Sequence, residues 1–151
     1  MVKKAGNRAI LIRSARISDA QRLAQLSGQL GYPAAAIEVR DRLRKLKSAS
    51  TNALFVAESP EAGVLGWAHV SVTHLVEVEI RAELHGLIVA EGQRSLGAGA
   101  RLLESVEHWA RQHGCRSMSV RSNVIRERAH KFYERQGYEH YKTQKAFRKA
   151  L

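Results

Sequence analysis

The sequence has little cysteine and proline, and their scarcity narrows the classes of protein it can belong to. One cysteine and two prolines occur among 151 residues. The single Cys115 cannot form an internal disulfide, and no histidine or second cysteine stands near it at the spacing of zinc ligands. Cys115 is therefore expected to be a small buried apolar residue.

Long apolar runs are also missing. No stretch of about 18 apolar residues is present, which excludes a membrane-spanning helix by length. Met1-Val2-Lys3-Lys4 leads into polar residues and not into the apolar core of a signal peptide. We therefore expect a cytoplasmic protein that does not bind membranes. With no repeats and with 44% hydrophobic and 26% charged residues, the composition predicts one ordinary globular domain over residues 1–151.

Acidic residues are outnumbered by basic ones. There are 25 Lys and Arg residues against 14 Asp and Glu residues, a formal net charge of +11, which predicts attraction to phosphate groups. The cations are spread over Arg40–Lys47, Arg121–Arg135 and Lys142–Lys149, without the interleaved aromatic residues of a nucleic-acid surface. A phosphate-rich cofactor would explain the positive charge without a nucleic acid, so we expect no nucleic-acid partner. A basic nucleic-acid-binding domain is kept as an alternative.

Apolar periodicity in the first half predicts strands and helices in alternation. The expected elements are a strand at Ala9–Arg13, a helix from the capping box Ser18–Gln21 to Gly31, a helix from Pro33 to about Lys47, a strand at Ala53–Ala57, a turn at Ser59–Gly63 and a strand at Val64–Thr73. The two strands at either side of the turn should pair antiparallel, and the two helices should cover the sheet. One face of the later strand carries Trp67, His69 and Ser71.

The second half is expected to open with a strand at Val76–Val89 that has one polar face. Its odd positions from Glu77 to His85 are polar, and the continuous apolar end Leu87-Ile88-Val89 indicates that a polar cleft begins midway. The later elements are a helix at Leu96–His113 with an apolar stripe of Leu102, Leu103, Val106 and Trp109, a strand at Ser117–Arg121, a helix at Arg126–Gln136 stopped by Gly137, and one or two strands from Tyr138 onward.

The junction from Val89 to Ala100 carries the strongest local signal for binding. It leads from a strand through a turn of small residues into an amphipathic helix. Unpaired N–H groups and the positive end of the helix dipole point at an anion in such a turn, and glycine lets phosphate oxygens approach the backbone. The glycine spacing matches neither the Rossmann nor the phosphate-loop pattern. By itself the turn is better explained as a tight strand-to-helix connection whose glycines ease packing.

Two motifs resemble a known family. Arg94-x-x-Gly97-x-Gly99 resembles the pyrophosphate signature Gln/Arg-x-x-Gly-x-Gly/Ala of the GNAT superfamily of acetyl-CoA-dependent N-acetyltransferases. Asn123, followed by Ala129-x-x-Phe132-Tyr133-x-x-x-Gly137-Tyr138, resembles the second cofactor motif of that family. The resemblance covers roughly Leu54–Phe147. It implies an α/β fold, with a mixed and mostly antiparallel sheet of six to seven strands flanked by about four helices. It also implies acetyl-CoA (coenzyme A) as co-substrate and a homodimer as one form of assembly.

The resemblance further implies which residues contact the cofactor. The strand end pairs with the pantetheine amides, the turn holds the pyrophosphate, and the second motif flanks the pantetheine arm and the thiol. These residues are Leu87, Ile88, Val89, Arg94, Ser95, Leu96, Gly97, Ala98, Gly99, Ala100, Asn123, Ala129, Phe132 and Tyr133. Ser95 and Leu96 depart from the common glycine and cation of the family, so Arg94 or Arg101 must supply the missing phosphate-facing charge.

Glu83 and Tyr133 are the expected catalytic residues. Glu83 lies fourteen residues before Gly97, which resembles the separation between the catalytic glutamate and the glycine loop in the histone-acetylating branch. An amine near neutral pH is mostly protonated, so a carboxylate, directly or through water, should remove a proton before the amine attacks the thioester. A tyrosine hydroxyl can then protonate the departing thiolate. The alternatives are a solvated Glu83 and a Tyr133 that merely packs.

Histidines 69, 74 and 85 fall on neighbouring expected strands. They can converge on a metal ion or supply an alternative base, but scattered histidines are more often surface or hydrogen-bonded core residues. We therefore expect no metal site.

The sequence thus predicts an N-acetyltransferase that acts on a primary amine of a small molecule. The alternatives are acetylation of a protein N-terminus or lysine, and a coenzyme A-binding module without turnover. The stretch Ser122–Tyr133 is similar to the tail of aminoalkylphosphonate acetyltransferases, which favours an anionic acceptor. Glu77, Glu79 and Glu83 instead favour a cationic acceptor such as an aminoglycoside or a polyamine.

Overall fold

The computed structural model describes residues 9–151, apart from the side chain of Ser95, so the expectation for Met1–Lys4 lies outside the described residues. The chain forms two compact units. The first extends to Arg121, and the second comprises Ser122–Leu151. Within the described residues, the first unit holds five strands and three α-helices, and the second holds one further helix. One domain over the whole chain stays a prediction.

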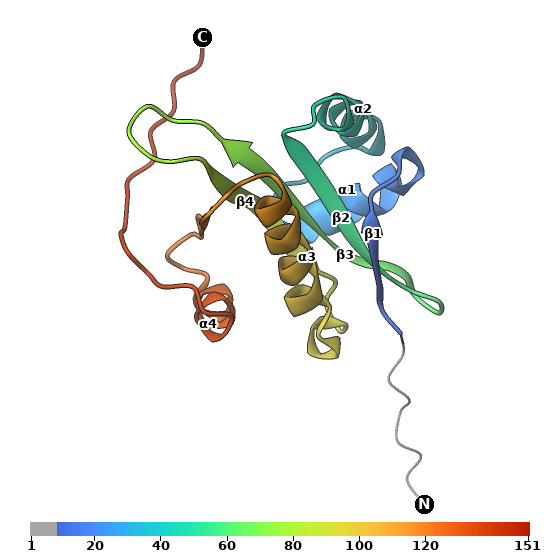
Figure 1. Ribbon diagram of the computed structural model, residues 1–151. Helices are drawn as coiled ribbons and strands as arrows, with labels where there is room; N and C mark the ends of the chain where they lie inside the picture. Colours follow the sequence, from blue (N-terminus) through green and yellow to red (C-terminus); the bar gives the residue numbers. More distant parts are fainter. Residues whose placement is uncertain (1–8) are drawn as a thin grey trace, which may run out of the picture. The chain divides into compact units, whose positions relative to one another are not determined.

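A five-stranded sheet in the order β1-β2-β3-β4-β5 forms the centre of the first unit (Figure 1). Its strands are β1 (Leu11–Ser14), β2 (Asn52–Ser59), β3 (Gly63–Thr73), β4 (Arg81–Val89) and β5 (Met118–Val120). The pairings from β1 to β4 are antiparallel, as expected for β2 and β3, and β4 pairs with β5 in parallel. The sheet is mixed, as expected, but the expectation of six to seven mostly antiparallel strands is not matched exactly, since the described residues form a sheet of five.

The strand or strands expected from Tyr138 onward are not found in the second unit. Its helix α4 (Glu127–Arg135) is followed by Gly137 in a left-handed conformation, with φ of 87°, as the sequence predicted for a helix stop. Residues 138–151 then carry no helix or strand and are exposed almost throughout. A strand needs a partner for its ladder, and no described strand of this unit offers one.

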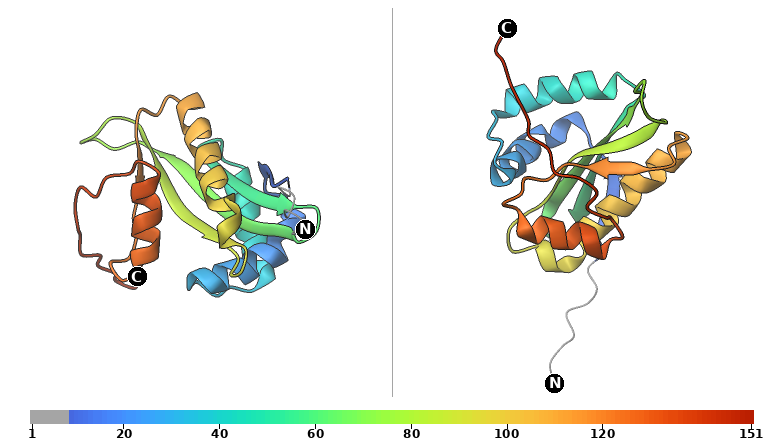
Figure 2. Two further views of the ribbon diagram at one scale, coloured as in Figure 1. Left: turned by 90° about the horizontal axis from the view of Figure 1, so that it is seen from below. Right: turned by 90° about the vertical axis from the view of Figure 1, so that its left-hand side faces the viewer.

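Helices cover both faces of the sheet in the first unit (Figure 2). Helices α1 (Ala20–Leu30) and α2 (Ala36–Lys47) lie over one face, and α3 (Ala98–Gln112) lies over the other. The first face is packed by apolar residues that include Leu23, Leu26, Leu43, Val56 and Ile88. On α3, the expected stripe is buried at Leu102, Leu103 and Val106, while Trp109 is only half-buried. Cys115 is buried as predicted.

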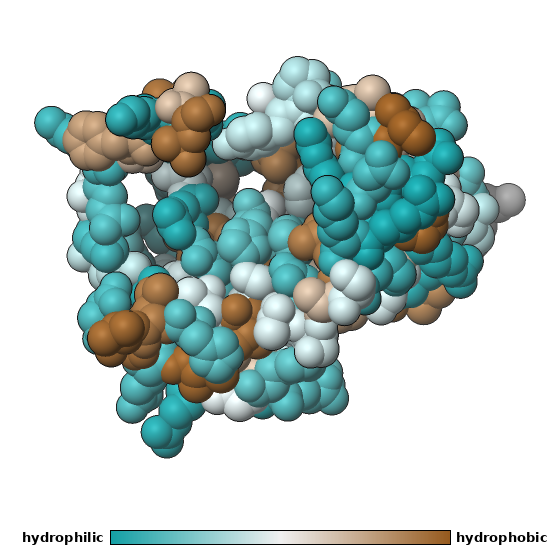
Figure 3. Space-filling model, turned by 90° about the horizontal axis from the view of Figure 1, so that it is seen from above, coloured by the Kyte–Doolittle hydropathy of each residue, from teal (hydrophilic) through white to brown (hydrophobic). Residues whose placement is uncertain are grey.

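The outer surface of α2 is strongly hydrophilic. Arg42, Arg44, Lys45 and Lys47 are exposed along it, and hydrophilic residues dominate the side of the first unit on which α2 lies (Figure 3). The helix packs instead through Leu43, which is buried. Among the described residues, no helix combines the length and apolar character needed to cross a bilayer.

Both N-terminal helices begin later than the sequence predicted. Ser18 does not cap α1. Residues Ile17–Asp19 form the short 3₁₀ helix η1, where the Asp19 carboxylate accepts from the Arg16 backbone N–H at 2.7 Å. Helix α2 begins at Ala36 and not at Pro33, because Glu38 accepts from the Ala35 backbone N–H at 2.9 Å and so caps the helix there.

Strand β4 is shorter than its alternating sequence predicted. It begins at Arg81, which pairs with Thr73 at the end of β3. Residues 74–79 before it are exposed and belong to the connection between the two strands. Alternation creates a polar face only where a ladder fixes the register. Glu77 and Glu79 therefore lie in a loop, and of the expected polar face only Arg81, Glu83 and His85 are on the strand.

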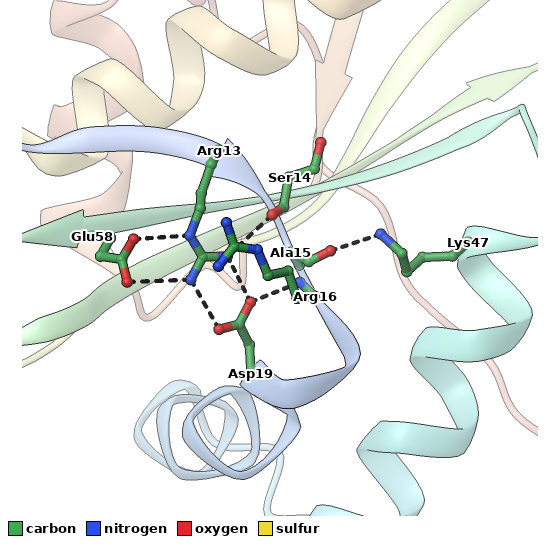
Figure 4. A network of polar contacts seen from close by, with 7 residues as sticks. All are labelled: Arg13, Ser14, Ala15, Arg16, Asp19, Lys47 and Glu58. Atoms are coloured by element: carbon green, nitrogen blue, oxygen red, sulfur yellow. Dashed lines mark hydrogen bonds and ion pairs between the residues drawn. The ribbon is translucent and has the colours of Figure 1, made fainter.

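An ion-pair network fastens β1 to β2 and to η1 (Figure 4). The Arg13 guanidinium donates from Nε to Glu58 at 2.9 Å and from its two terminal nitrogens to the Asp19 carboxylate at 2.8 and 3.0 Å. The hydrogen bond from Arg13 is the main cause that holds the pKa of Asp19, and likewise that of Glu58, below its usual range. The side chains of Arg13 and Asp19 are only 12% and 10% exposed, so their pairing is poorly screened.

We expect Asp19→Asn to lower the free energy of unfolding at pH 7 by about 1–3 kcal/mol, the range for hydrogen bonds to charged groups. The pKa of Asp19 is lower in the folded state than in the unfolded state. Its stabilisation is therefore complete above the unfolded pKa and is lost as the pH falls through the folded pKa. The difference between variant and parent should shrink in acid, which urea unfolding at a series of pH values measures.

Asp41→Asn is the matched control, because Asp41 pairs with Arg44 at 3.3 Å and both side chains are more than half exposed. Its effect should stay within about 0.5 kcal/mol. A loss in Asp19→Asn that is no larger than this, or that does not change with pH, would contradict the role of the network.

Candidate active site

The turn between β4 and α3 has the features of an anion site. Gly92 and Gly97 adopt left-handed φ values of 79° and 78°, which favour glycine. Gly97 is the N-cap of α3, and no described side chain caps the helix, so the N–H groups of its first turn have no acceptor within it. A Cβ at Gly97 would meet nothing within 4 Å. The start of α3 therefore offers unpaired backbone donors, as phosphate binding requires.

Arg94 and Arg101 are the two cations expected to supply positive charge to the turn, and of these only Arg94 is hydrogen-bonded to the end of β4. Arg94 belongs to the short 3₁₀ helix η2 (Arg94–Leu96), and its Nε donates to the Val89 carbonyl at 3.2 Å, which ties the turn to the end of β4. Arg101 instead donates to the backbone carbonyl of Ile10. Leu96 is half exposed. The side chain of Ser95 lies outside what the structure describes.

The second half of β4 has an open edge. Strand β5 pairs only with Ala82, Glu83 and Leu84, so among the described residues no strand pairs with that edge of β4 from His85 to Val89. The opposite edge of β4 remains paired with β3 over this stretch. Backbone N–H and C=O groups at an open edge can pair with another extended chain. This edge contains Leu87, Ile88 and Val89, the residues expected to meet an amide-bearing cofactor arm.

Glu83 is a buried and ion-paired carboxylate. It is 7% exposed and stands opposite Ser71 in the β3–β4 register. Arg121, just after β5, donates from Nε at 2.8 Å and approaches through its second nitrogen at 2.6 Å, both to Oε1. No hydrogen bond from the described residues reaches Oε2. Glu83 is thus not the solvated strand residue of the alternative interpretation.

Two of the three histidines converge beside Glu83. The rings of His69 and His85 lie 4.8 Å apart, His69 Nε2 is 3.0 Å from Asn52 Oδ1, and His85 Nε2 is 2.6 Å from Ser71 Oγ. Asn52 and Glu83 both stand opposite Ser71 in the sheet, so these residues share one face. Together Asn52, His69, Ser71, Glu83 and His85 form a polar strip. His74 is exposed in the β3–β4 connection, and the described residues contain no cluster of metal ligands.

The second unit contains the aromatic pair of the second motif. On α4, Ala129, Phe132 and Tyr133 are half-buried while Glu127, Arg128, Glu134 and Arg135 are exposed, as their helical spacing predicted. The Tyr133 ring contacts Phe132 at 5.2 Å and Tyr138 at 5.8 Å. Burial raises the pKa of Tyr133 to about 12, against the opposing effect of the Arg126 cation. Its hydroxyl is therefore protonated at neutral pH.

Asn123 uses its side chain locally. Its Oδ1 accepts from the Ile125 backbone N–H at 3.1 Å, and its carbonyl accepts from His130 Nε2 at 2.9 Å and from the Arg126 N–H at 3.0 Å. These contacts shape the turn that begins α4. Its expected contact with a cofactor stays a prediction.

The Acetyltransferase (GNAT) family matches residues 20–138 of the chain. The chain belongs to this family. A curated relative from Stenotrophomonas maltophilia, an aminoglycoside N(6')-acetyltransferase type 1, is 30% identical over 132 residues, which are 85% of each chain. An enzyme of the same name from Klebsiella aerogenes is 28% identical over 108 residues, 70% of this chain and 71% of the relative. The fold is similar to that of the aminoglycoside N-acetyltransferase AAC(6')-Iy, solved in complex with CoA, with a TM-score of 0.84, 19% identity and full coverage of both chains.

Membership in the GNAT family establishes the activity class. The chain is an acyltransferase, and acetyl-CoA is its co-substrate. The residues of the first unit fit this co-substrate. The uncapped start of α3 suits the pyrophosphate, and the open edge of β4 suits the amide-bearing pantetheine arm. When bound, acetyl-CoA supplies an activated thioester. Which residues contact it stays a prediction.

Sequence reasoning missed two partners in this site of a GNAT enzyme. The sequence places Arg121 in a basic segment and at the end of an expected strand, and it does not single out Asn52. Arg121 is 38 residues from Glu83, and Asn52 is 17 residues from His69. No local pattern signals either contact, since both depend on which strands lie side by side.

Proposed function

We propose that the chain transfers the acetyl group of acetyl-CoA to a primary amine of a cationic small molecule, such as an aminoglycoside or a polyamine. One observation carries this proposal. Strand β4 bears, in succession, the buried carboxylate of Glu83, the open edge from His85 to Val89, and the turn into α3. A base and the segment suited to the acetyl donor therefore follow each other along one rigid element, which supports direct attack of the amine on the thioester.

Glu83 acts as the base in this proposal. The amine must lose a proton before it is nucleophilic, and Glu83 accepts that proton directly or through one water molecule. Arg121 binds Oε1 and fixes the carboxylate, so Oε2 is the oxygen directed to the substrate. Burial excludes bulk water from the carboxylate and strengthens its attraction for an ammonium group.

Tyr133 acts as the acid. The thiolate released after the acetyl group has moved needs a proton, and the Tyr133 hydroxyl keeps its proton at neutral pH because burial raises its pKa to about 12. The pantetheine contacts are assigned to Leu87, Ile88, Val89, Asn123, Ala129 and Phe132, and the pyrophosphate contacts to the turn residues from Arg94 to Ala100. These assignments rest on the family motifs.

A cationic acceptor is favoured over an anionic one. The curated relatives at 28% and 30% identity are named as aminoglycoside N(6')-acetyltransferases. In the first unit, the Glu83 carboxylate is the buried anion of the polar strip, and Glu77 and Glu79 are exposed in the neighbouring connection. The competing acceptor is an anionic amine, which the similarity of Ser122–Tyr133 to aminoalkylphosphonate acetyltransferases favours.

The test is the release of free coenzyme A from acetyl-CoA in the presence of a panel of amines, with the acetylated product identified by mass. The panel contains an aminoglycoside with a 6′-amine, its counterpart with a 6′-hydroxyl, a polyamine, an aminoalkylphosphonate and a lysine-bearing peptide. We expect the 6′-amine compound or the polyamine to be turned over. Loss of release with the 6′-hydroxyl counterpart would locate the acetylated amine.

Other outcomes decide against the proposal. Faster release with the aminoalkylphosphonate would replace the cationic acceptor by an anionic one, and activity confined to the peptide would indicate a protein substrate. Acetyl-CoA binding by calorimetry without release for any amine would indicate a binding module.

A further inference from the structure

The polar strip contains more than the proposed base. His85 stands on β4 at a register shift in the ladder, where His69 pairs with Gly86 and Val70 pairs with Leu84. His85 is therefore the extra residue of a β-bulge and has no partner opposite. A bulge re-aims the side chain that it carries. Here it brings the imidazole over Ser71 and His69 on β3 and leaves it exposed.

His85 lies between the two proposed halves of the reaction. It is two residues after Glu83 and two residues before Leu87. An amine that contacts Glu83 and approaches an acetyl group aligned with Leu87–Val89 must pass the imidazole. Gly86, next to it, leaves no room for a larger residue, because a Cβ there would lie 2.7 Å from the Trp67 ring.

The neighbours of His85 hold one of its nitrogens and leave the other free. Ser71 Oγ is 2.6 Å from Nε2, and no described residue contacts Nδ1. His69 behind it donates from Nε2 to Asn52, and burial, with a contribution from the nearby His85, lowers the pKa of His69 to about 4. His69 is therefore neutral at pH 7. The charged side chains nearest to His85 along β4 are Glu83, which pairs with Arg121, and Arg81 at the start of the strand.

We propose that His85 is a specificity-determining residue for the acceptor: Ser71 fixes its Nε2, and its Nδ1 accepts a hydrogen bond from the amine that Glu83 deprotonates. The inference rests on the proposed function. An ammonium group has three N–H donors, so one can contact Glu83 Oε2 while a second contacts His85 Nδ1. The two contacts hold the nitrogen beside the open edge of β4, and once Glu83 has taken its proton the amine turns the lone pair left there toward the thioester. No proton is transferred to His85, so its contribution is to binding and orientation.

Two substitutions at His85 separate the roles of its nitrogens. Asparagine places its Oδ1 one bond from Cγ, as Nδ1 is, and so keeps an acceptor for the amine while it loses the contact with Ser71. Glutamine reaches the distance of Nε2 and keeps the Ser71 contact, but it has no acceptor at the position of Nδ1. We expect His85→Gln to raise KM for the amine about tenfold or more, because a hydrogen bond to a charged group is lost.

The same measurements should leave the chemical step almost untouched. In His85→Gln, kcat is expected to stay within about threefold of the parent, which marks a loss of binding shared by ground state and transition state. His85→Asn should keep KM for the amine within about threefold, and neither variant should change KM for acetyl-CoA. His74→Gln is the control, since His74 is an exposed histidine outside the polar strip. Circular dichroism checks that each variant is folded.

The kinetics are measured with the amine that is turned over best in the panel. An unchanged KM in His85→Gln would overturn the assignment of His85 and leave the proposed function intact. A loss of amine binding in His85→Asn but not in His85→Gln would mean that the Ser71 contact, and not the amine contact, is what matters. Equal losses in both variants would tie binding to the whole imidazole ring and overturn the assignment of Nδ1. If no amine on the panel supports coenzyme A release, the proposed function fails first, and the role of His85 fails with it.

Discussion

Glu83→Gln is expected to lower turnover by about a hundredfold or more at neutral pH, the usual scale for loss of a positioned base. Glutamine keeps the shape of the side chain and can still accept a hydrogen bond from Arg121, but its amide cannot take up a proton. Binding of acetyl-CoA, measured by calorimetry, should persist. The dependence of the rate on pH should change as well, because glutamine cannot accept a proton from the amine.

Glu104→Gln is the control for this substitution, as Glu104 is an exposed residue of α3. It should leave turnover and the pH–rate profile unchanged. Kinetics also distinguish the roles of Glu83 and His85 in the polar strip. The loss in Glu83→Gln should appear in kcat, and the loss in His85→Gln should appear in KM for the amine. A parental rate and profile in Glu83→Gln would assign the proton to another group or to water alone.

Tyr133→Phe is expected to lower turnover by roughly ten- to a thousandfold, with little change in acetyl-CoA affinity. The substitution removes only the hydroxyl and keeps the ring contacts with Phe132 and Tyr138. A hydroxyl with a pKa of about 12 gives its proton to a thiolate uphill, since a thiol has a pKa of about 8.5. The smaller effect is therefore expected where water can deliver the proton. Steady-state release of coenzyme A at saturating acetyl-CoA is the measurement.

Tyr141→Phe provides the matched control, because Tyr141 is a 66% exposed tyrosine of the same unit. It should behave as the parent does. Equal rates in Tyr133→Phe and the parent would remove the acid role from Tyr133. A rate loss accompanied by weaker acetyl-CoA binding would instead point to a contribution of the hydroxyl to cofactor affinity.

The helices and the glycines that end them were the most predictable part of the fold. The left-handed glycines 31, 114 and 137 follow α1, α3 and α4 as the sequence indicated. Such signals are local, because a helix satisfies its hydrogen bonds within a few residues of each end. The errors at Ser18 and Pro33 were also local, since Asp19 and Glu38, one and five residues further on, accept from the backbone N–H groups of Arg16 and Ala35.

Strands were less predictable because their partners lie far away in the chain. The alternation from Val76 to Ile80 fits a strand, yet these residues join β3 to β4 because β3 ends at Thr73. The strands expected after Tyr138 fail for a related reason, since the described part of the second unit offers no ladder. A strand exists only where a neighbour completes its hydrogen bonds.

The sequence alone determined the turn from β4 into α3, the half-buried face of α4 with Phe132 and Tyr133, and the family motifs that they carry. All of these depend on residues within about two helical turns of one another. Only the tertiary structure decided that Glu83 is buried against Arg121, that Arg101 is engaged with Ile10, and that His85 is turned by a bulge onto Ser71 and His69. These contacts join residues 14 to 91 positions apart. They follow from strand order, register and one irregularity in a ladder, which no local pattern of residue types encodes.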